Sequence, residues 1–130
     1  MTRTAIATEQ APQAIGPYSQ AIVAGDFVFC SGQGAIDRVT GEFEPGTIES
    51  ETTRTLANIG GLLGAAGVGF GDVVKTTVFL VDMGDFAAMN AIYATVFPDP
   101  PPARSTVAVA ALPKGFKVEI EVVAYKPHGV

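Results

Sequence analysis

Arg104 raises the first chemical question in this chain because of where it stands. It opens the apolar segment "PPARSTVAVAALP", and between Phe86 and Pro113 only Asp99 and Arg104 carry a formal charge. A guanidinium presents two parallel N–H donors in a rigid fork that matches a carboxylate. At the start of a strand, behind a stiff run of prolines, that fork predicts a grip on a small carboxylate. A solvent-exposed arginine, or one paired with Glu119 or Glu121, is the alternative.

Alternation along the last two predicted strands divides their side chains between two faces of a sheet. The branched apolar set is predicted to pack against helices and consists of Ser105, Val107, Val109, Val118, Ile120, Val122 and Ala124. The opposite face is small or polar and is predicted to carry Arg104, Glu119 and Glu121. Because no further element remains in the chain to cover that face, water or another subunit must do so.

A simple hairpin about Lys114 would not bring Arg104 close to Glu119. In such a hairpin Arg104 faces Val123, and Glu119 lies about four residues further, roughly 13 Å along the strand. A site that uses both side chains is therefore expected to be shared across an interface between subunits.

The elements that must position these residues follow from hydrophobic spacing and turn signals. Residues 47–67 and 83–97 have the spacing of amphipathic helices, and Thr47 is a suitable N-cap for the first. Glycines 60, 61 and 64 are expected to let that helix lie close to the sheet. The predicted strands are residues 19–23, 27–31, 72–82, 104–110 and 117–125. At 130 residues this is one domain, 1–130, of the α+β class: a mixed β-sheet with two helices packed on one face.

Composition narrows the function classes. The net charge is −5 and the eight Lys and Arg residues are scattered, which argues against nucleic acid and anionic membranes as partners. No apolar run is long enough for a transmembrane span and no signal peptide is evident, which makes a cytoplasmic protein the default. Only 16% of the residues are charged, against about 25% as a rule, while 48% are hydrophobic. This surplus predicts either burial between subunits or an ordinary core rich in Ala and Gly.

The chain lacks the residues for several kinds of catalytic centre. It has one cysteine, Cys30, and one histidine, His128 in the tail, so neither a Cys/His zinc cluster nor a Ser-His-Asp triad is expected. No phosphate-binding glycine motif occurs. We therefore expect no metal and no organic cofactor, and interpret Cys30 as a small buried hydrophobic residue.

Several ordered motifs together resemble the RidA family, also called YjgF, along almost the entire chain. They are "IATEQAPQAIGPYSQA", "SGQ", "GDVVKTTVFLVDMGDFAAMN", "PPARSTV" and "LPKGFKVEIEVVA". The resemblance implies a chorismate-mutase-like fold and a homotrimer, in which three sheets form a central barrel with the helices outside. It also implies that the last strand is central in the sheet, against the simple hairpin.

The resemblance further implies a cofactor-independent reaction. Members of the family hydrolyse 2-imino acids and their enamine tautomers, such as 2-iminobutanoate and 2-iminopropanoate, to 2-oxo acids and ammonia. Arg104 matches the carboxylate-binding arginine, and Glu119 matches the glutamate that orients water. Proton transfers are expected through water, Glu119 or Tyr18, and a backbone N–H near Thr106 is expected at the imine nitrogen. Positions that match pocket residues between subunits are Tyr18, Gly32 and Asn90.

The chain departs from the family pattern at two places. Thr106 stands where the family often has cysteine, which excludes a reactive thiol there, and the loop between Tyr93 and Pro102 is shorter than in common members. Two other functions compete with the deaminase. A trimeric sensor or scaffold would bind a 2-oxo acid without turnover. A ribonuclease or translation inhibitor is disfavoured by the acidic charge and the missing catalytic histidine.

Overall fold

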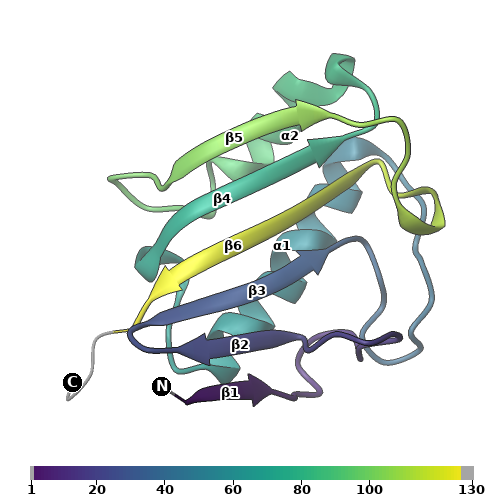
Figure 1. Ribbon diagram of the computed structural model, residues 1–130. Coiled ribbons are helices and arrows are strands. Elements are labelled where there is room, and N and C mark those ends of the chain that lie inside the picture. The colour runs from purple at the N-terminus through teal and green to yellow at the C-terminus, as the bar shows by residue number, and fades with distance from the viewer. Residues whose placement is uncertain (1, 127–130) are drawn as a thin grey trace.

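The computed structural model describes residues 2–126, in which two helices cover one face of a six-stranded sheet (Figure 1). His128 lies outside the described residues. The strands are β1 (Arg3–Ile6), β2 (Ala21–Ala24), β3 (Phe27–Gln33), β4 (Val73–Leu80), β5 (Ala103–Ala108) and β6 (Val118–Tyr125), and the helices are α1 (Ile48–Ala65) and α2 (Phe86–Tyr93). Three short 3₁₀ turns, Phe70–Asp72, Met83–Asp85 and Pro113–Gly115, connect them. The predicted α+β class is confirmed.

The strands lie in the order β1-β2-β3-β6-β4-β5, so the last strand is central. β6 pairs antiparallel with both β3 and β4, whereas β5 pairs parallel with β4 and forms an edge of the sheet. A hairpin between the last two strands is therefore wrong for this chain, and the central position that the family resemblance implied is confirmed.

The predicted elements are present, with two differences. β1 was not predicted; it pairs with β2 and forms the other edge of the sheet. α2 ends at Tyr93 rather than continuing to residue 97. Past Tyr93 the backbone tightens into turns: the Thr95 N–H donates to the Ile92 carbonyl, and the Thr95 hydroxyl donates to the same oxygen over 2.7 Å. A threonine that takes a helix carbonyl in this way competes with continuation of the helix.

The helices and the sheet enclose the core. Leu56, Ile59, Leu62 and Leu63 of α1 are buried against apolar side chains of the central strands β4 and β6, namely Val78, Leu80, Ile120 and Val122. The predicted N-cap of α1 is confirmed, since the Thr47 hydroxyl accepts from the Ser50 N–H at 3.1 Å.

Of the glycines in α1, Gly61 serves close packing, but not against the sheet as predicted, and an added Cβ at Gly64 would meet nothing within 4 Å. A Cβ at Gly61 would lie 2.7 Å from the carbonyl carbon of Gln10, so this glycine admits the chain segment that follows β1. Gln20 fixes the same segment: its side chain accepts from the Thr8 N–H and donates to the Pro12 carbonyl, each at 2.7 Å. This packing sets the position of the loop that leads to Tyr18.

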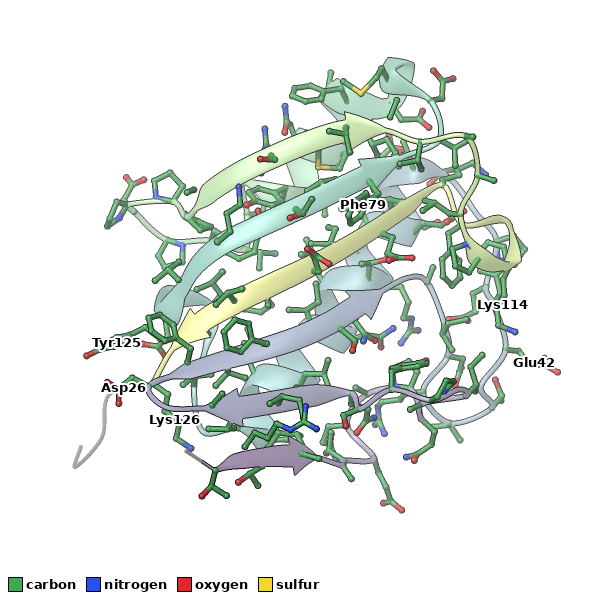
Figure 2. All side chains as sticks on the ribbon, in the orientation of Figure 1. Asp26, Glu42, Phe79, Lys114, Tyr125 and Lys126 are labelled. Atoms are coloured by element: carbon green, nitrogen blue, oxygen red, sulfur yellow. The ribbon has the colours of Figure 1, made fainter. Side chains whose placement is uncertain are left out.

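Within residues 2–126, no helix covers the other face of the sheet (Figures 1 and 2). Large apolar side chains lie exposed on it, among them Phe27, Phe29 and Tyr125, which form a ring cluster with centroids 5.7–6.4 Å apart. Figure 2 shows Phe79 and Tyr125 on this face. Of the helices within residues 2–126, none is long and apolar enough to cross a membrane.

Candidate active site

Arg104 lies on the helix-covered face of the sheet, contrary to the prediction. It stands in register with Thr76, which is fully buried beneath α2. Its Nη1 donates to Oδ1 of Asn90 at 2.7 Å, and its guanidinium carbon lies 4.8 Å from the centroid of the Tyr93 ring. The alternation in β5 was correct but was assigned to the wrong faces, because Ser105 and Val107, predicted to be inward, point to the uncovered face and are exposed. An edge strand of alternating small and branched residues gives no sequence signal for which face is buried.

Glu119 lies on the uncovered face, as predicted. Its neighbours along β6, Val118 and Ile120, are fully buried on the helix side, so the carboxylate points away from the helices. Glu119 is half-buried, and this burial, followed by the negative charge of Glu121, raises its pKa above the usual value. A raised pKa brings the carboxyl closer to the range in which it can exchange protons during a reaction at neutral pH.

Gly32 makes room for that carboxylate. The pairing of β3 with β6 shifts register between Cys30 and Gln33, which places an irregular step of β3 beside Glu119. A Cβ at Gly32 would lie 2.9 Å from the Glu119 carboxyl carbon and would overlap one of its oxygens. The bulge and the glycine together let the Glu119 side chain lie against the backbone of β3.

A pocket of about 740 Å³ opens beside Glu119. Tyr18, Gly32 and Glu119 line it together with Glu121, and the cations Arg38 and Lys114 lie in the surrounding loops. Apolar side chains complete the wall: Ile15, Ile36, Val39 and Phe116. The structure thus brings three of the predicted site residues into one hollow, which combines a carboxylate with an apolar lining.

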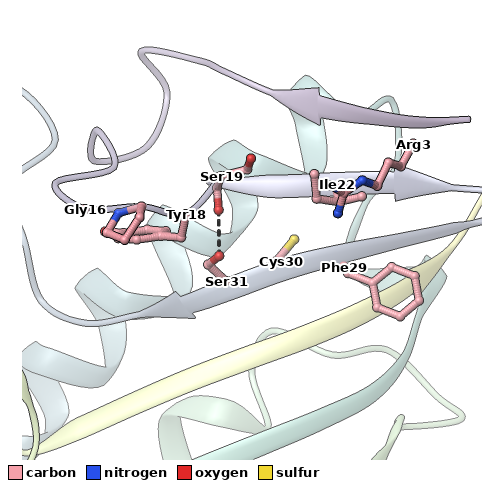
Figure 3. Close-up of a pocket in the computed structure, with 9 residues that line it drawn as sticks. Arg3, Gly16, Tyr18, Ser19, Ile22, Phe29, Cys30 and Ser31 are labelled. Atoms are coloured by element: carbon pink, nitrogen blue, oxygen red, sulfur yellow. Dashed lines mark hydrogen bonds between the residues drawn. The ribbon is translucent and has the colours of Figure 1, made fainter.

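Tyr18 lies between this pocket and a second, shallower hollow next to β2 and β3 (Figure 3). The Tyr18 side chain is 50% exposed, and its hydroxyl accepts a long hydrogen bond of 3.4 Å from the Ile15 N–H. Figure 3 also shows the hydrogen bond of 2.6 Å from the Ser31 hydroxyl to the Ser19 carbonyl, which ties the Tyr18 loop to β3. The phenol group is therefore held loosely and faces open space.

Thr106 follows Arg104 on the helix side of β5 and is half-buried. Its hydroxyl oxygen is buried and has no hydrogen-bond partner among the described residues. β5 lies at the sheet edge, so part of its backbone N–H groups point away from any strand. Such groups are available to a ligand or to another chain.

The six predicted site residues therefore form two groups on opposite faces of the sheet. Arg104, Asn90 and Thr106 belong to the β5 edge and α2, while Tyr18, Gly32 and Glu119 belong to the pocket beside β3 and β6. Within the part of the chain that the structure describes, neither Glu119 nor Glu121 forms an ion pair with Arg104. A small ligand bound at one group would therefore lie on the other side of the sheet from the second group.

Phe86 and Tyr93 were missed as residues that contact Arg104. No role in the site was predicted for either residue, yet the rings of both lie near the guanidinium. Phe86, Asn90 and Tyr93 follow each other at spacings of four and three residues, which places them on one face of a helix. That spacing was visible in the sequence, but nothing in it linked this face to Arg104.

The remaining candidate groups are inert in this structure. Cys30 is buried, and burial raises the pKa of its thiol to about 11, which keeps it protonated. Its predicted role as a small hydrophobic residue is confirmed. Among residues 2–126 no group of three or more His, Cys, Asp and Glu side chains is arranged to hold a metal ion.

Comparison with known proteins shows which family the chain resembles along most of its length. Residues 8–126 match the family described as Endoribonuclease L-PSP. The chain is 53% identical over 121 residues to a RutC family protein of Pyrococcus horikoshii, covering 93% of this chain and 96% of that protein. It is 48% identical over 122 residues to the 2-iminobutanoate/2-iminopropanoate deaminase of Mus musculus, covering 94% and 90%.

The fold of the chain is also similar to that of solved structures. The crystal structure of RidA from an Antarctic Psychrobacter superposes with a TM-score of 0.90 at 43% identity, covering 94% of this chain and 98% of that one. The family match, residues 8–126, spans the positions of Tyr18, Gly32, Asn90, Arg104 and Glu119. On this evidence the chain belongs to the RidA (YjgF) family.

Proposed function

We propose that this protein hydrolyses small 2-imino acids and their enamine tautomers, such as 2-iminobutanoate and 2-iminopropanoate, to 2-oxo acids and ammonia. We propose further that it does so as a homotrimer whose sites lie between neighbouring copies. The observation that carries the proposal is the separation of Arg104 and Glu119 on opposite faces of the sheet. A two-part site of this kind becomes complete only when the β5 edge of one copy meets the pocket of another.

The surface of the chain supports assembly. β5 is an edge strand, and the face of the sheet without helices exposes Phe27, Phe29 and Tyr125. Exposed apolar patches of this kind usually mark contacts with other molecules. Burial of this face between copies would also account for the low charged content of the chain.

The chemistry follows from the two groups. Arg104 would bind the substrate carboxylate through its remaining N–H donors and so fix the position of C2, the electrophilic carbon of the C=N bond. Glu119 of the neighbouring copy would hold a water molecule and accept its proton as the oxygen attacks C2. The electron pair of the C=N bond moves to nitrogen, which takes up that proton, and a carbinolamine results. Transfer of the hydroxyl proton to nitrogen through Glu119 or water then forms the C=O bond as the C–N bond breaks, and ammonia and the 2-oxo acid leave. Positioning of this kind, with one general base, supplies catalysis without a cofactor.

The relatives support this reaction over the alternatives. One close relative is named 2-iminobutanoate/2-iminopropanoate deaminase, although another is named only as a RutC family protein. The name of the matched family refers to ribonuclease activity, which the net charge of −5 and the scattered cations of this chain do not favour. A non-catalytic sensor would bind 2-oxo acids through the same arginine and would differ from the deaminase only in having no turnover.

A coupled assay tests the proposal. A pyridoxal-phosphate-dependent threonine dehydratase generates 2-iminobutanoate, and the appearance of 2-oxobutanoate is followed with and without this protein. We expect acceleration by the wild type and no acceleration by Arg104→Ala or Glu119→Gln. Calorimetric titration with 2-oxobutanoate should show that Glu119→Gln still binds and that Arg104→Ala does not.

The alternatives predict different results. A wild-type protein that binds 2-oxobutanoate but does not accelerate its formation would establish the sensor. A wild-type protein that neither binds nor accelerates would contradict the proposed carboxylate grip altogether. Cleavage of RNA that persists in highly purified Arg104→Ala protein would favour the ribonuclease.

A further inference from the structure

Three side chains from a single helix surround the guanidinium of Arg104 and fix its orientation. Asn90 accepts from Nη1 at 2.7 Å, and the guanidinium carbon lies 5.5 Å from the centroid of the Phe86 ring and 4.8 Å from that of Tyr93. Phe86, Asn90 and Tyr93 occupy positions i, i+4 and i+7 of α2, so one helical face meets the guanidinium.

The Tyr93 ring also contacts two residues other than Arg104. Its hydroxyl shares a buried hydrogen bond of 2.7 Å with the hydroxyl of Thr76, the residue beside Arg104 in the parallel pairing of β4 with β5. The Tyr93 ring also packs against the Phe97 ring, and the two ring centroids lie 4.4 Å apart. Tyr93 is almost completely buried, and this burial raises the pKa of its phenol, so the ring stays neutral beside the cation.

We infer that Phe86 and Tyr93 are positioning residues for ligand binding: with Asn90 they form a clamp that holds the Arg104 guanidinium in its carboxylate-binding orientation. The inference rests on the proposed role of Arg104 and extends it to two residues that act through the guanidinium. A free arginine side chain loses considerable rotamer freedom when it binds an anion. The clamp removes that freedom before the ligand arrives, which improves affinity without any added contact to the ligand.

The clamp also determines which N–H donors of the guanidinium remain free for a ligand. Nη1 is engaged by Asn90, and two aromatic rings lie next to the cation. Donors that Asn90 does not occupy remain for a carboxylate. The role of Asn90 is thereby changed from a pocket residue that touches substrate, as predicted, to one that acts through Arg104.

The test compares binding of 2-oxobutanoate to the intact protein by calorimetric titration. Phe86→Leu and Tyr93→Leu are each expected to weaken binding by roughly 2- to 30-fold, the range given by loss of one cation–π contact. Tyr93→Phe keeps the ring and loses only the bond to Thr76, so it should bind nearly as the wild type does. The matched control is Phe97→Leu, which removes an aromatic ring packed on Tyr93 without touching Arg104. It should lower the melting temperature and leave affinity within about twofold of wild type.

The outcomes separate the clamp from the function it depends on. Suppose that Arg104→Ala loses binding while folded Phe86→Leu and Tyr93→Leu bind with wild-type affinity. That result would overturn the clamp but leave intact the proposal that Arg104 binds the carboxylate. Equal weakening in Phe97→Leu and Tyr93→Leu would also overturn it, because the effect would then follow general loosening of the core. Unchanged binding in Arg104→Ala would instead contradict the proposed function. Weakening by Tyr93→Leu, recovery in Tyr93→Phe and no effect of Phe97→Leu would support the inference.

Discussion

At the scale of single residues, the properties of Glu119 are set by what surrounds it. Burial and the charge of Glu121 both raise its pKa, and Gly32 leaves the space in which the carboxylate lies. The charged form of Glu119 is the one that can hold and deprotonate water. The proposed activity should therefore fall on acidification, at a higher pH than an ordinary glutamate would dictate.

The substitution Glu121→Gln tests this pH dependence. It removes the neighbouring negative charge, so the pKa of Glu119 should fall and its carboxylate should persist to lower pH. The acidic limb of kcat/KM is then expected to move to lower pH, while the cations Arg38 and Lys114 around the same pocket are unchanged. The measurement is a pH–rate profile in the coupled assay. A limb that stays in place or moves upward would contradict the influence of Glu121.

The substitution Gly32→Ala tests the space beside Glu119. The new methyl group would overlap the carboxylate and push the end of a flexible side chain aside. We expect turnover to fall by at least about tenfold, since small misplacements of a catalytic group are costly, with 2-oxobutanoate binding nearly unchanged. Rates and titrations on the same preparation provide the comparison. An equal loss of binding and turnover would show that the change reaches beyond Glu119.

At the scale of elements, α1 shows that packing decides whether a glycine stabilises or destabilises the protein. Gly61 and Gly64 both lie inside the helix, where glycine weakens a helix relative to alanine. A Cβ at Gly61 would meet the Gln10 carbonyl, whereas a Cβ at Gly64 would meet nothing within 4 Å. The same substitution should therefore have opposite effects at positions three residues apart.

Thermal or chemical unfolding of the two variants makes this comparison. Gly64→Ala is expected to raise the free energy of unfolding by about 0.5–1 kcal/mol, from helix propensity alone. Gly61→Ala should lower it by more than that amount, because the segment after β1 must move away from the helix. Stabilisation by Gly61→Ala would mean that the segment that contains Gln10 shifts at no cost.

At the scale of the whole molecule, the proposed reaction needs Arg104 of one copy and Glu119 of another, because the two residues lie on opposite faces of the sheet. Mixed oligomers of Arg104→Ala and Glu119→Gln test this requirement, because each inactive variant supplies the residue that the other lacks. If each site takes Arg104 from one subunit and Glu119 from its neighbour, an equal mixture in a cyclic trimer should regain about a quarter of wild-type activity per site.

The mixture must be formed by joint refolding or co-expression, so that subunits exchange. The matched control mixes Arg104→Ala with a double variant that carries both substitutions, which can form no intact site. Activity in the first mixture that does not exceed the control would place both residues in one subunit's site and would contradict the shared arrangement.

The sequence by itself determined much of the architecture. Hydrophobic spacing, turn signals and the Thr47 cap located the strands β2 to β6 and both helices, because these signals depend only on neighbours along the chain. They also placed Glu119 on the uncovered face, since it lies between Val118 and Ile120, whose burial is evident from β6 alone. β1 escaped prediction because its residues are mostly exposed and carry little pattern.

Only the tertiary structure decided which face Arg104 joins and which partners it meets. β5 is an edge strand with apolar residues on both alternating sets, so its orientation depends on its parallel pairing with β4 and on the position of α2. The contact of Arg104 with Phe86, Asn90 and Tyr93 follows from that pairing. Contacts between segments far apart in the chain are set by how the sheet and helices pack, and local sequence patterns carry no record of them.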